Sequence, residues 1–444
     1  MRRLLVCLAL LPLVAAPLKA QGLRDQISQL FIFGPGEDPL FLAGSGDPDN
    51  PAYLQLHGTH FIPSASAGNG TIISFITSAV STNVADFPFS AASGGVTFRF
   101  EGGAPVATST SPGPIYAERA QTLGRGRTLV GFAYSSFRYA TLRGVDLDNV
   151  QLTFTHENVT GHTCDSVFGA SCDPMGVPAW ENDIMPFTLA LDIRVNVASF
   201  VLTYGLTDRL DLGIALPLVT TALEGHSLAQ IIPFGGTTAT HYFAGTPSDP
   251  VLTASRMVQG NATGLGDVAV RLKLNVHSSD RGGLALLADG RFPTGSARDL
   301  LGAGRFSGRV LGVMSGRFGD FSPHANVGYL FRSGSQRNDA IIGTAGFDHL
   351  MAPWATFVAD VISQWQVGEN KLALPGPVTI TQPFLRTVNT SDIPDVRDDI
   401  VNASLGFKFT LGQGPTIITN TLFPLDRGGL RPNLLYTVGV EYSF

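Results

Sequence analysis

Hydrophobic and polar residues alternate with a period of two along much of the chain. From Phe187 to Val197 every odd position is apolar, while the even positions include Asp192 and Arg194. The same alternation runs through 210–218, 268–276, 401–411 and 434–444. A period of two is that of a β-strand, whose successive side chains point to opposite faces. The pattern predicts an all-β protein whose strands each have one apolar and one polar face.

Fourteen strands are expected, joined by connections of alternating length. The expected strands are 94–101, 127–139, 148–156, 185–204, 210–218, 264–277, 284–293, 307–318, 323–332, 340–348, 355–365, 398–411, 416–423 and 434–444. The connections that begin at 140, 205, 278, 319, 349 and 412 are short, and those that begin at 102, 157, 219, 294 and 366 are long. Those at 333 and 424 are intermediate and fall in the long series. An even strand number with short turns on one side is typical of an outer-membrane β-barrel. The expected fold is a transmembrane antiparallel barrel of about 14 strands, within a range of 12–16.

The low charge of the chain favours a barrel over a soluble alternative. A secreted β-sandwich also has alternating strands, but only 14% of this chain is charged, against the usual share of about 25% in soluble proteins. Lipid offers the backbone no hydrogen-bond partner, so strands can cross a membrane only when they close on themselves. The final residue, Phe444, ends an alternating strand and resembles the C-terminal signal that the barrel-assembly machinery binds.

The N-terminus has the features of a secretory signal peptide. Arg2 and Arg3 precede an apolar run at 4–14 and a stretch of mostly small residues that ends at Ala20. A membrane-anchoring helix is the alternative, but the run is shorter than the ~20 residues that span a bilayer. We therefore expect a signal peptide at 1–20, an N-terminal extension at 21–93 and a barrel at 94–444, located in the bacterial outer membrane. The extension is polar and forms either a plug in the lumen or a periplasmic segment.

Charge and cysteine content narrow the possible partners. The net charge is −6 and no run of Lys or Arg is present, which argues against nucleic acid as a partner. Cys164 and Cys172 remain after removal of the signal peptide, and export favours a local disulfide between them. Because no further Cys or His lies at ligand spacing, we expect neither a metal nor another cofactor.

A set of polar residues on the expected strands is predicted to line the lumen. Its members are Asp192, Arg194, Asp211, Asp267, Arg271, Lys273, Asp289, Arg291, Asn326, Asp360 and Lys408. Facing charges of mixed sign form either ion-pair ladders in a wet lumen or a charged constriction that screens solutes.

The two longest loops, 219–263 and 366–397, contain apolar patches. They include Ile231, Ile232, Phe234, Tyr242, Phe243 and Phe384. An exposed apolar patch often marks a binding site, here one for a hydrophobic solute. The alternative is that these residues pack loop on loop across the mouth of the barrel.

A catalytic arrangement has little support. Ser322, His324 and Asn326 fall close enough for an outer-membrane lipase, which needs a serine, its histidine base and an orienting polar group. Nothing else in the sequence supports such a triad, so we expect no enzyme.

Several segments resemble one family of outer-membrane proteins. They are Tyr204–Leu218, Gly264–Lys273, the Phe-Pro-Thr-Gly segment at 292–295, Pro323–Tyr329 and Pro114–Ala120 followed by Gly-Arg-Gly at 124–126. Together they are similar to the family labelled "meta-pathway of phenol degradation", which is distantly similar to the long-chain fatty-acid channels. The resemblance covers roughly 112–444 and implies a barrel that passes hydrophobic small molecules.

Two functions remain open. The first is a monomeric outer-membrane channel, surrounded by lipid, that admits fatty acids or aromatic compounds through the lumen or a lateral gap between strands. The second is a non-conducting structural or sensory barrel whose lumen is filled by side chains and by residues 21–93.

Overall fold

The computed structural model describes most of the chain. The residues described are 22–33, 43–44, 63–85, 98–101, 104–107, 112–155, 184–233, 241–246, 248–334, 337–372, 374, 376–380, 385–412 and 414–444. They form strands and two helices, α1 (Leu23–Gln29) and α3 (Pro63–Ala85). Neither of these two described helices is long and apolar enough to cross a membrane.

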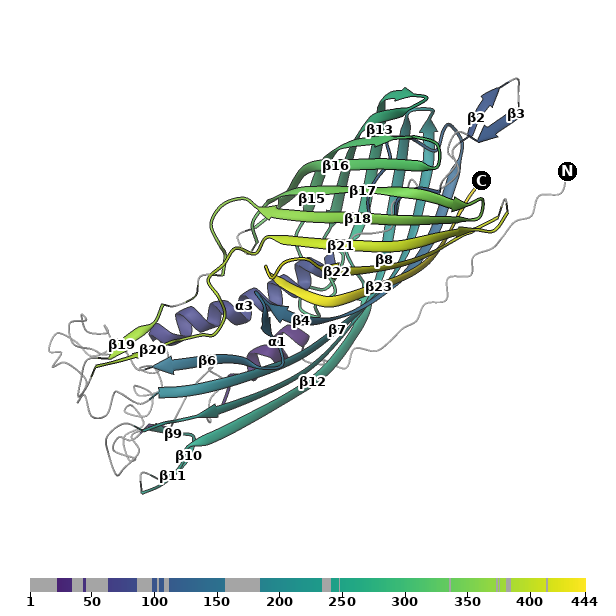
Figure 1. The fold of residues 1–444 in the computed structure, drawn as a ribbon. Coiled ribbons are helices and arrows are strands. Elements are labelled where there is room, and N and C mark those ends of the chain that lie inside the picture. Colours follow the sequence, from purple (N-terminus) through teal and green to yellow (C-terminus); the bar gives the residue numbers. More distant parts are fainter. Residues whose placement is uncertain are drawn as a thin grey trace, which may run out of the picture.

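Twelve antiparallel strands close into a barrel (Figure 1). They are β4 (Thr128–Leu142), β7 (Ile184–Thr207), β8 (Leu210–Gln230), β13 (Val268–Ser279), β14 (Gly282–Phe292), β15 (Ser307–Gly316), β16 (Phe321–Arg332), β17 (Ala340–Ala352), β18 (Ala355–Gln366), β21 (Ile400–Thr410), β22 (Thr416–Pro424) and β23 (Leu430–Ser443). Each strand pairs with the next one in this order, and β23 pairs with β4. No strand of the ring is left with an open edge, as a lipid environment requires.

The remaining strands lie outside the ring. Three of them extend the barrel sheet: β5 (Val145–Asp146), β6 (Val150–Thr155) and β12 (Thr253–Leu265). The others form two-stranded pairs: β1 (Ala43–Gly44) with β9 (His241–Tyr242), β2 (Phe98–Glu101) with β3 (Ala104–Ala107), β10 (Ala244–Thr246) with β11 (Asp249–Val251), and β19 (Val378–Ile380) with β20 (Arg386–Val388).

The predicted all-β barrel and its even strand number are confirmed, but the best estimate of 14 strands was two too many. Of the segment 94–101 the structure describes 98–101, and there β2 pairs with β3 and with no strand of the barrel. The segment 148–156 corresponds to β6, which continues along β7 beyond the end of β4. Alternation shows that a segment is a strand, but it does not identify the strand's partners. Both errors have this cause.

Strands β7 and β8 continue past one end of the barrel, where β6 and β12 join them to form a four-stranded sheet extension. β7 has 24 residues and β8 has 21, whereas about 9–11 residues suffice for a strand to cross a bilayer. Beyond the barrel, β6 pairs with β7 and β12 pairs with β8. The extension lies at the end opposite the C-terminus (Figure 1).

The apolar face of β7 and β8 changes sides where the extension begins. In β7 the buried positions 187–197 are apolar and odd-numbered, whereas Phe200, Leu202 and Tyr204 are even-numbered and exposed. β8 makes the same change after Leu218, and Ala198 pairs with Leu218 at the same level. The apolar face therefore points outward in the barrel and inward in the extension.

Helices α1 and α3 cover the inner face of the extension. Ile27 of α1 and Ile76 of α3 are fully buried in one apolar cluster with residues of β6, β7 and β8. Phe31, just after α1, stacks on Phe187 with ring centroids 4.6 Å apart. Burial of this apolar surface is the main force that holds the N-terminal helices against the sheet.

The outer face of the barrel is apolar. Its exposed large side chains include Phe132, Tyr134, Leu202, Leu272, Leu286, Val310, Val327, Tyr436 and Val438. An apolar outer band around a closed barrel indicates an outer-membrane protein. Phe154 and Phe187, however, are buried in the core, so they do not belong to this band.

Candidate functional site

A segment without regular structure crosses the interior of the barrel. We call residues 112–123, which lie four residues before the start of β4, the strap. Its partners lie around the whole circumference. Ile115 packs with Val358 and Ile418, and the Tyr116 hydroxyl lies 2.8 Å from that of Thr437. The backbone N–H of Glu118 donates to Asn326 (2.9 Å), that of Ala120 to Ser315 (3.1 Å) and that of Leu123 to Asp211 (3.0 Å).

Buried ion pairs fasten the strap to the barrel wall. Glu118 accepts a hydrogen bond from Arg271 at 2.7 Å, and its other oxygen lies 3.8 Å from the Lys273 ammonium. Lys273 also lies 3.9 Å from Asp211. Arg119 donates to Asp348 at 2.5 Å. Asp211 and Asp348 lie toward the ends of their strands on the side of the C-terminus, as do Ser315, Val358 and Ile418, so the strap narrows that half of the lumen.

The register of β13, β14 and β15 brings charged side chains of these three strands together beside the strap. Asp289 on β14 faces Arg271 on one side and Arg309 on the other. Its carboxylate oxygens lie 3.2 Å from Arg271 Nε, 3.4 Å from Arg291 Nε and 3.3 Å from Arg309 Nη2. One buried carboxylate is thus shared by three guanidinium groups.

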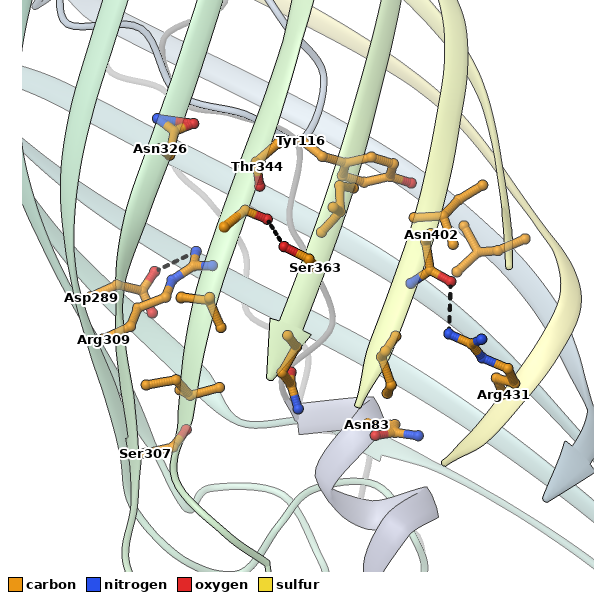
Figure 2. Close-up of a pocket in the computed structure, with 18 of the residues that line it drawn as sticks. Asn83, Tyr116, Asp289, Ser307, Arg309, Asn326, Thr344, Ser363, Asn402 and Arg431 are labelled. Atoms are coloured by element: carbon orange, nitrogen blue, oxygen red, sulfur yellow. Dashed lines mark hydrogen bonds and ion pairs between the residues drawn. The ribbon is translucent and has the colours of Figure 1, made fainter. Parts of the chain in front are cut away.

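A cavity of about 210 Å³ lies between the strap and the end of α3. Tyr116 and Asn326 line its strap end, and Asn83 of α3 lines the other (Figure 2). Glu118, whose backbone is bonded to Asn326, also belongs to the lining. The last turn of α3 is fixed there, because Arg291 donates to the carbonyl of Ala85 and Asn83 donates to the carbonyl of Leu430 (2.9 Å).

The wall of this cavity combines apolar and polar side chains. The apolar ones are Phe137, Leu311, Leu330, Ile342, Ile362, Ile400, Leu422, Leu430, Pro432 and Leu435. Asp289 and Arg309 lie on one wall, and Asn402 and Arg431 lie on the opposite wall (Figure 2). The arrangement suits a small molecule with an apolar body and a polar group.

Most of the polar residues expected in the lumen lie inside the barrel. Arg271, Lys273, Asp289 and Arg291 join the charge clusters just described, as does Asp211, and all are buried. Asn326, Asp360 and Lys408 are buried as well, and Lys408 lies 3.1 Å from Glu441. Asp267 has a different role, since it accepts hydrogen bonds from the backbone of Gly295 and Ala303, both at 2.9 Å, and closes a loop.

Asp192 and Arg194 lie on the outer face of the sheet extension, which corrects their expected place in the lumen. The guanidinium of Arg194 lies 2.6 Å from Asp192, and Arg138 bonds the same carboxylate at 2.9 Å. The reason is the reversal of the apolar face. In this part of β7 the inner face is packed against α1 and α3, so the polar positions point outward.

The apolar loop residues are largely part of the core. Ile231, Tyr242 and Phe243 are buried, and Phe243 contacts Phe33 with ring centroids 5.4 Å apart. Ile232 is exposed. Phe234 and Phe384 lie outside the described residues. Three of the four described members are thus buried, with contacts to the N-terminal segment and the sheet extension, so their role in binding stays a prediction.

The residues considered for catalysis take part in other contacts. His324 Nε2 lies 2.6 Å from Asp360, and Nδ1 lies 3.6 Å from Asp348. Within the described residues, no hydrogen bond joins Ser322 to His324, and no group of three or more His, Cys, Asp or Glu residues could hold a metal.

Three other expectations concern the ends and loops of the chain. Phe444 is exposed, stacks on Tyr442 and exchanges two backbone hydrogen bonds with Thr128. Its role as an assembly signal stays a prediction. The disulfide between Cys164 and Cys172 and the signal peptide at 1–20 fall outside the described residues.

The strap and the cavity were not predicted as functional elements from the sequence. The strap lacks periodicity, and only its resemblance to a family segment singled out 114–120. Arg309 was missed because the inward face of β15 mixes polar and apolar residues, in the order Ser307, Arg309, Leu311 and Val313. Arg431 was missed because β23 was expected to begin at 434.

Comparisons with solved structures find outer-membrane channels, at low similarity. The first is an outer membrane channel from Pseudomonas putida F1, with 13% identity and a TM-score of 0.42, covering 73% of this chain and 98% of that one. The second is the toluene transporter TbuX from Ralstonia pickettii (10%, TM-score 0.33, 72% and 90% covered). The third is a FadL homologue from Pseudomonas aeruginosa (12%, TM-score 0.32, 82% and 97% covered).

Comparisons at the sequence level agree with the family resemblance. No curated protein matches the chain. Residues 188–377 match the model of the family described as "Putative MetA-pathway of phenol degradation". This range includes the segments 204–218, 264–273, 292–295 and 323–329, so the resemblance noted in the sequence is confirmed for that part of the barrel.

Proposed function

We propose that the protein is an outer-membrane channel that admits hydrophobic small molecules, such as aromatic compounds or fatty acids. The observation that carries this proposal is the cavity of about 210 Å³ inside a closed barrel, with apolar walls and a few converging polar groups. Such sites typically bind small molecules. The family match over 188–377 supports the same function.

The route has a gate at each end of the cavity. From the outside, a solute reaches the cavity past the end of α3, where Asn83 and Ala85 are bonded to the barrel wall. Passage to the periplasm then requires movement of the strap, which the Glu118 and Arg119 ion pairs hold in place. The buried loop residues Ile231 and Phe243 support the sheet extension in this scheme.

The proposal includes the setting of the channel. Residues 1–20 direct export and are removed, and Phe444 is part of the signal that the barrel-assembly machinery binds. The finished barrel is a monomer in the outer membrane and has no catalytic activity.

Uptake by cells tests the function. Cells that lack their own fatty-acid channel would express the full chain, and heat-modifiable migration would verify folding. We expect faster uptake of labelled toluene, oleate or both than in cells with an empty vector. Equal uptake with folded barrel in the membrane would contradict the proposal.

A non-conducting structural barrel is the second candidate, favoured by the strap, which crosses the lumen, and by the end of α3, which is bonded to the barrel wall at the cavity. Deletion of 21–93 and disruption of the strap separate the two functions. For a channel, the double change should raise conductance in planar bilayers well above either single change. For a structural barrel, the strap variants should instead unfold or remain closed.

A further inference from the structure

Two arginine side chains at the cavity have hydrogen-bond donors that the protein does not use. The Nε atoms of Arg309 on β15 and Arg431 on β23 are buried and have no hydrogen-bond partner within the described residues. They belong to opposite walls of the cavity (Figure 2). A buried donor without a partner is unfavourable. The cavity is therefore suited to a ligand that supplies an acceptor.

The charges around the cavity favour an anionic acceptor. Three arginines line it, Arg291, Arg309 and Arg431, against two carboxylates, Glu118 and Asp289. Asp289 is already shared with Arg271, and Arg431 is paired with Asp426 outside the lining. The side chain of Arg309 is 20% exposed, compared with 10% for Arg271 and 4% for Arg291. Arg309 is the most accessible cation of the Asp289 cluster.

The size of the cavity limits the apolar part of the ligand. A dry apolar cavity of about 150 Å³ is large enough to bind benzene. At about 210 Å³, this cavity has room for one ring and a small substituent. Leu330, Ile342 and Ile362 provide apolar contacts for the ring. An extended long-chain molecule would not fit as a whole.

We propose that the cavity is a binding site for a small monocyclic carboxylate, with Arg309 as the residue that anchors the carboxylate. One carboxylate oxygen accepts a hydrogen bond from Arg309 Nε, while Asp289 holds the guanidinium in place through Nη2. The ring packs against the apolar wall. This inference rests on the proposed function, since it places the solute of the channel in the cavity.

Binding of benzoate to the purified full chain, refolded in detergent, tests the site. Benzyl alcohol and toluene serve as neutral probes of similar size. We expect saturable benzoate binding by equilibrium dialysis, and roughly tenfold weaker binding in Arg309→Gln, as expected for loss of a charged hydrogen bond. Arg317→Gln, in the turn after β15, is the matched control and should bind as the unaltered protein does. Binding of the neutral probes should be weaker and should not change in Arg309→Gln.

A second variant distinguishes loss of the binding site from misfolding of the protein. Ile342→Trp would fill the cavity without removing a charge, and it should abolish binding of benzoate while heat-modifiable migration persists. Equal benzoate affinity in Arg309→Gln, tighter binding of toluene than of benzoate, or no benzoate binding to the folded protein would each overturn the proposal. Uptake of toluene or oleate by cells is independent of this result, so failure of the carboxylate site leaves the channel function to be judged separately.

Discussion

The carboxylate of Glu118 lies 2.7 Å from the guanidinium of Arg271, and both side chains are buried inside the barrel. Removal of one partner from a buried ion pair leaves an uncompensated charge, which costs about 3 kcal/mol at the lower end of the usual range. Glu118→Ala should therefore lower the free energy of unfolding by about this amount in urea titrations of the refolded protein. It should also raise the frequency of open events in planar bilayers. Arg125→Ala, at an exposed position just after the strap, should change neither quantity; an equal effect there would argue against the strap as a gate.

Two arginines, Arg138 on β4 and Arg143 in the turn directly after it, allow a comparison of buried and exposed ion pairs. Arg143 is fully buried and bonds both oxygens of Asp398, at 2.8 and 3.0 Å. Arg138 pairs with Asp192 at the surface, with its side chain 55% exposed. Arg143→Ala should destabilise the protein by roughly 3–5 kcal/mol, whereas Arg138→Ala should cost at most about 1 kcal/mol. Chemical denaturation of both variants measures the difference, and similar costs would contradict the assigned burial.

The position of the membrane can be tested with two outward-facing residues. Leu286 is near the middle of β14, and Met257 is on β12 in the sheet extension. Both are exposed. Arginine at the bilayer midplane of a barrel costs about 2–4 kcal/mol, so Leu286→Arg should destabilise the protein in lipid vesicles by that amount. Met257→Arg should have almost no effect, because this site lies outside the lipid. A large loss of stability in Met257→Arg would show that the lipid also covers this part of the sheet extension.

Substitution of Phe444 distinguishes an effect on assembly in cells from an effect on the stability of the folded protein. Its side chain is exposed, so it contributes little to packing. Phe444→Ala should therefore refold in vitro with unchanged stability, yet reach the outer membrane of cells in much smaller amounts. Fractionation of expressing cells measures the second effect. Normal amounts in the membrane would show that Phe444 is not needed for assembly.

Local alternation was sufficient to predict the barrel wall, because lipid outside and a lumen inside impose a period of two on every spanning strand. The positions Leu272, Leu274 and Val276 face outward as expected. The same argument failed for Phe187–Val197. There the inner surface is covered by α1 and α3, and periodicity alone cannot distinguish a lipid-facing side from a packed one. The change of apolar parity after Ala198 was nevertheless present in the sequence, and it marks the point where the surroundings of the strand change.

The candidate site was harder to predict because its residues are far apart in the sequence. Glu118 is separated from Arg271 by 153 positions, and Arg119 is separated from Asp348 by 229. Nothing in the local pattern of an irregular segment indicates that it lies inside a barrel. Charged residues of regular strands, such as Asp289 and Lys273, were recognised because their strands constrain the direction in which they point.

The place of the strap in the chain also constrains the order of assembly. The strap lies four residues before β4, and β4 pairs with the last strand, β23, to complete the ring. Once that seam has formed, the strap cannot enter from the side, because the lumen is enclosed by paired backbone. It must be inside the unfinished sheet, or be threaded through one open end. Contacts between segments so distant in sequence form late and slowly, so the final pairing of β23 with β4 is the step that commits the barrel to a closed interior.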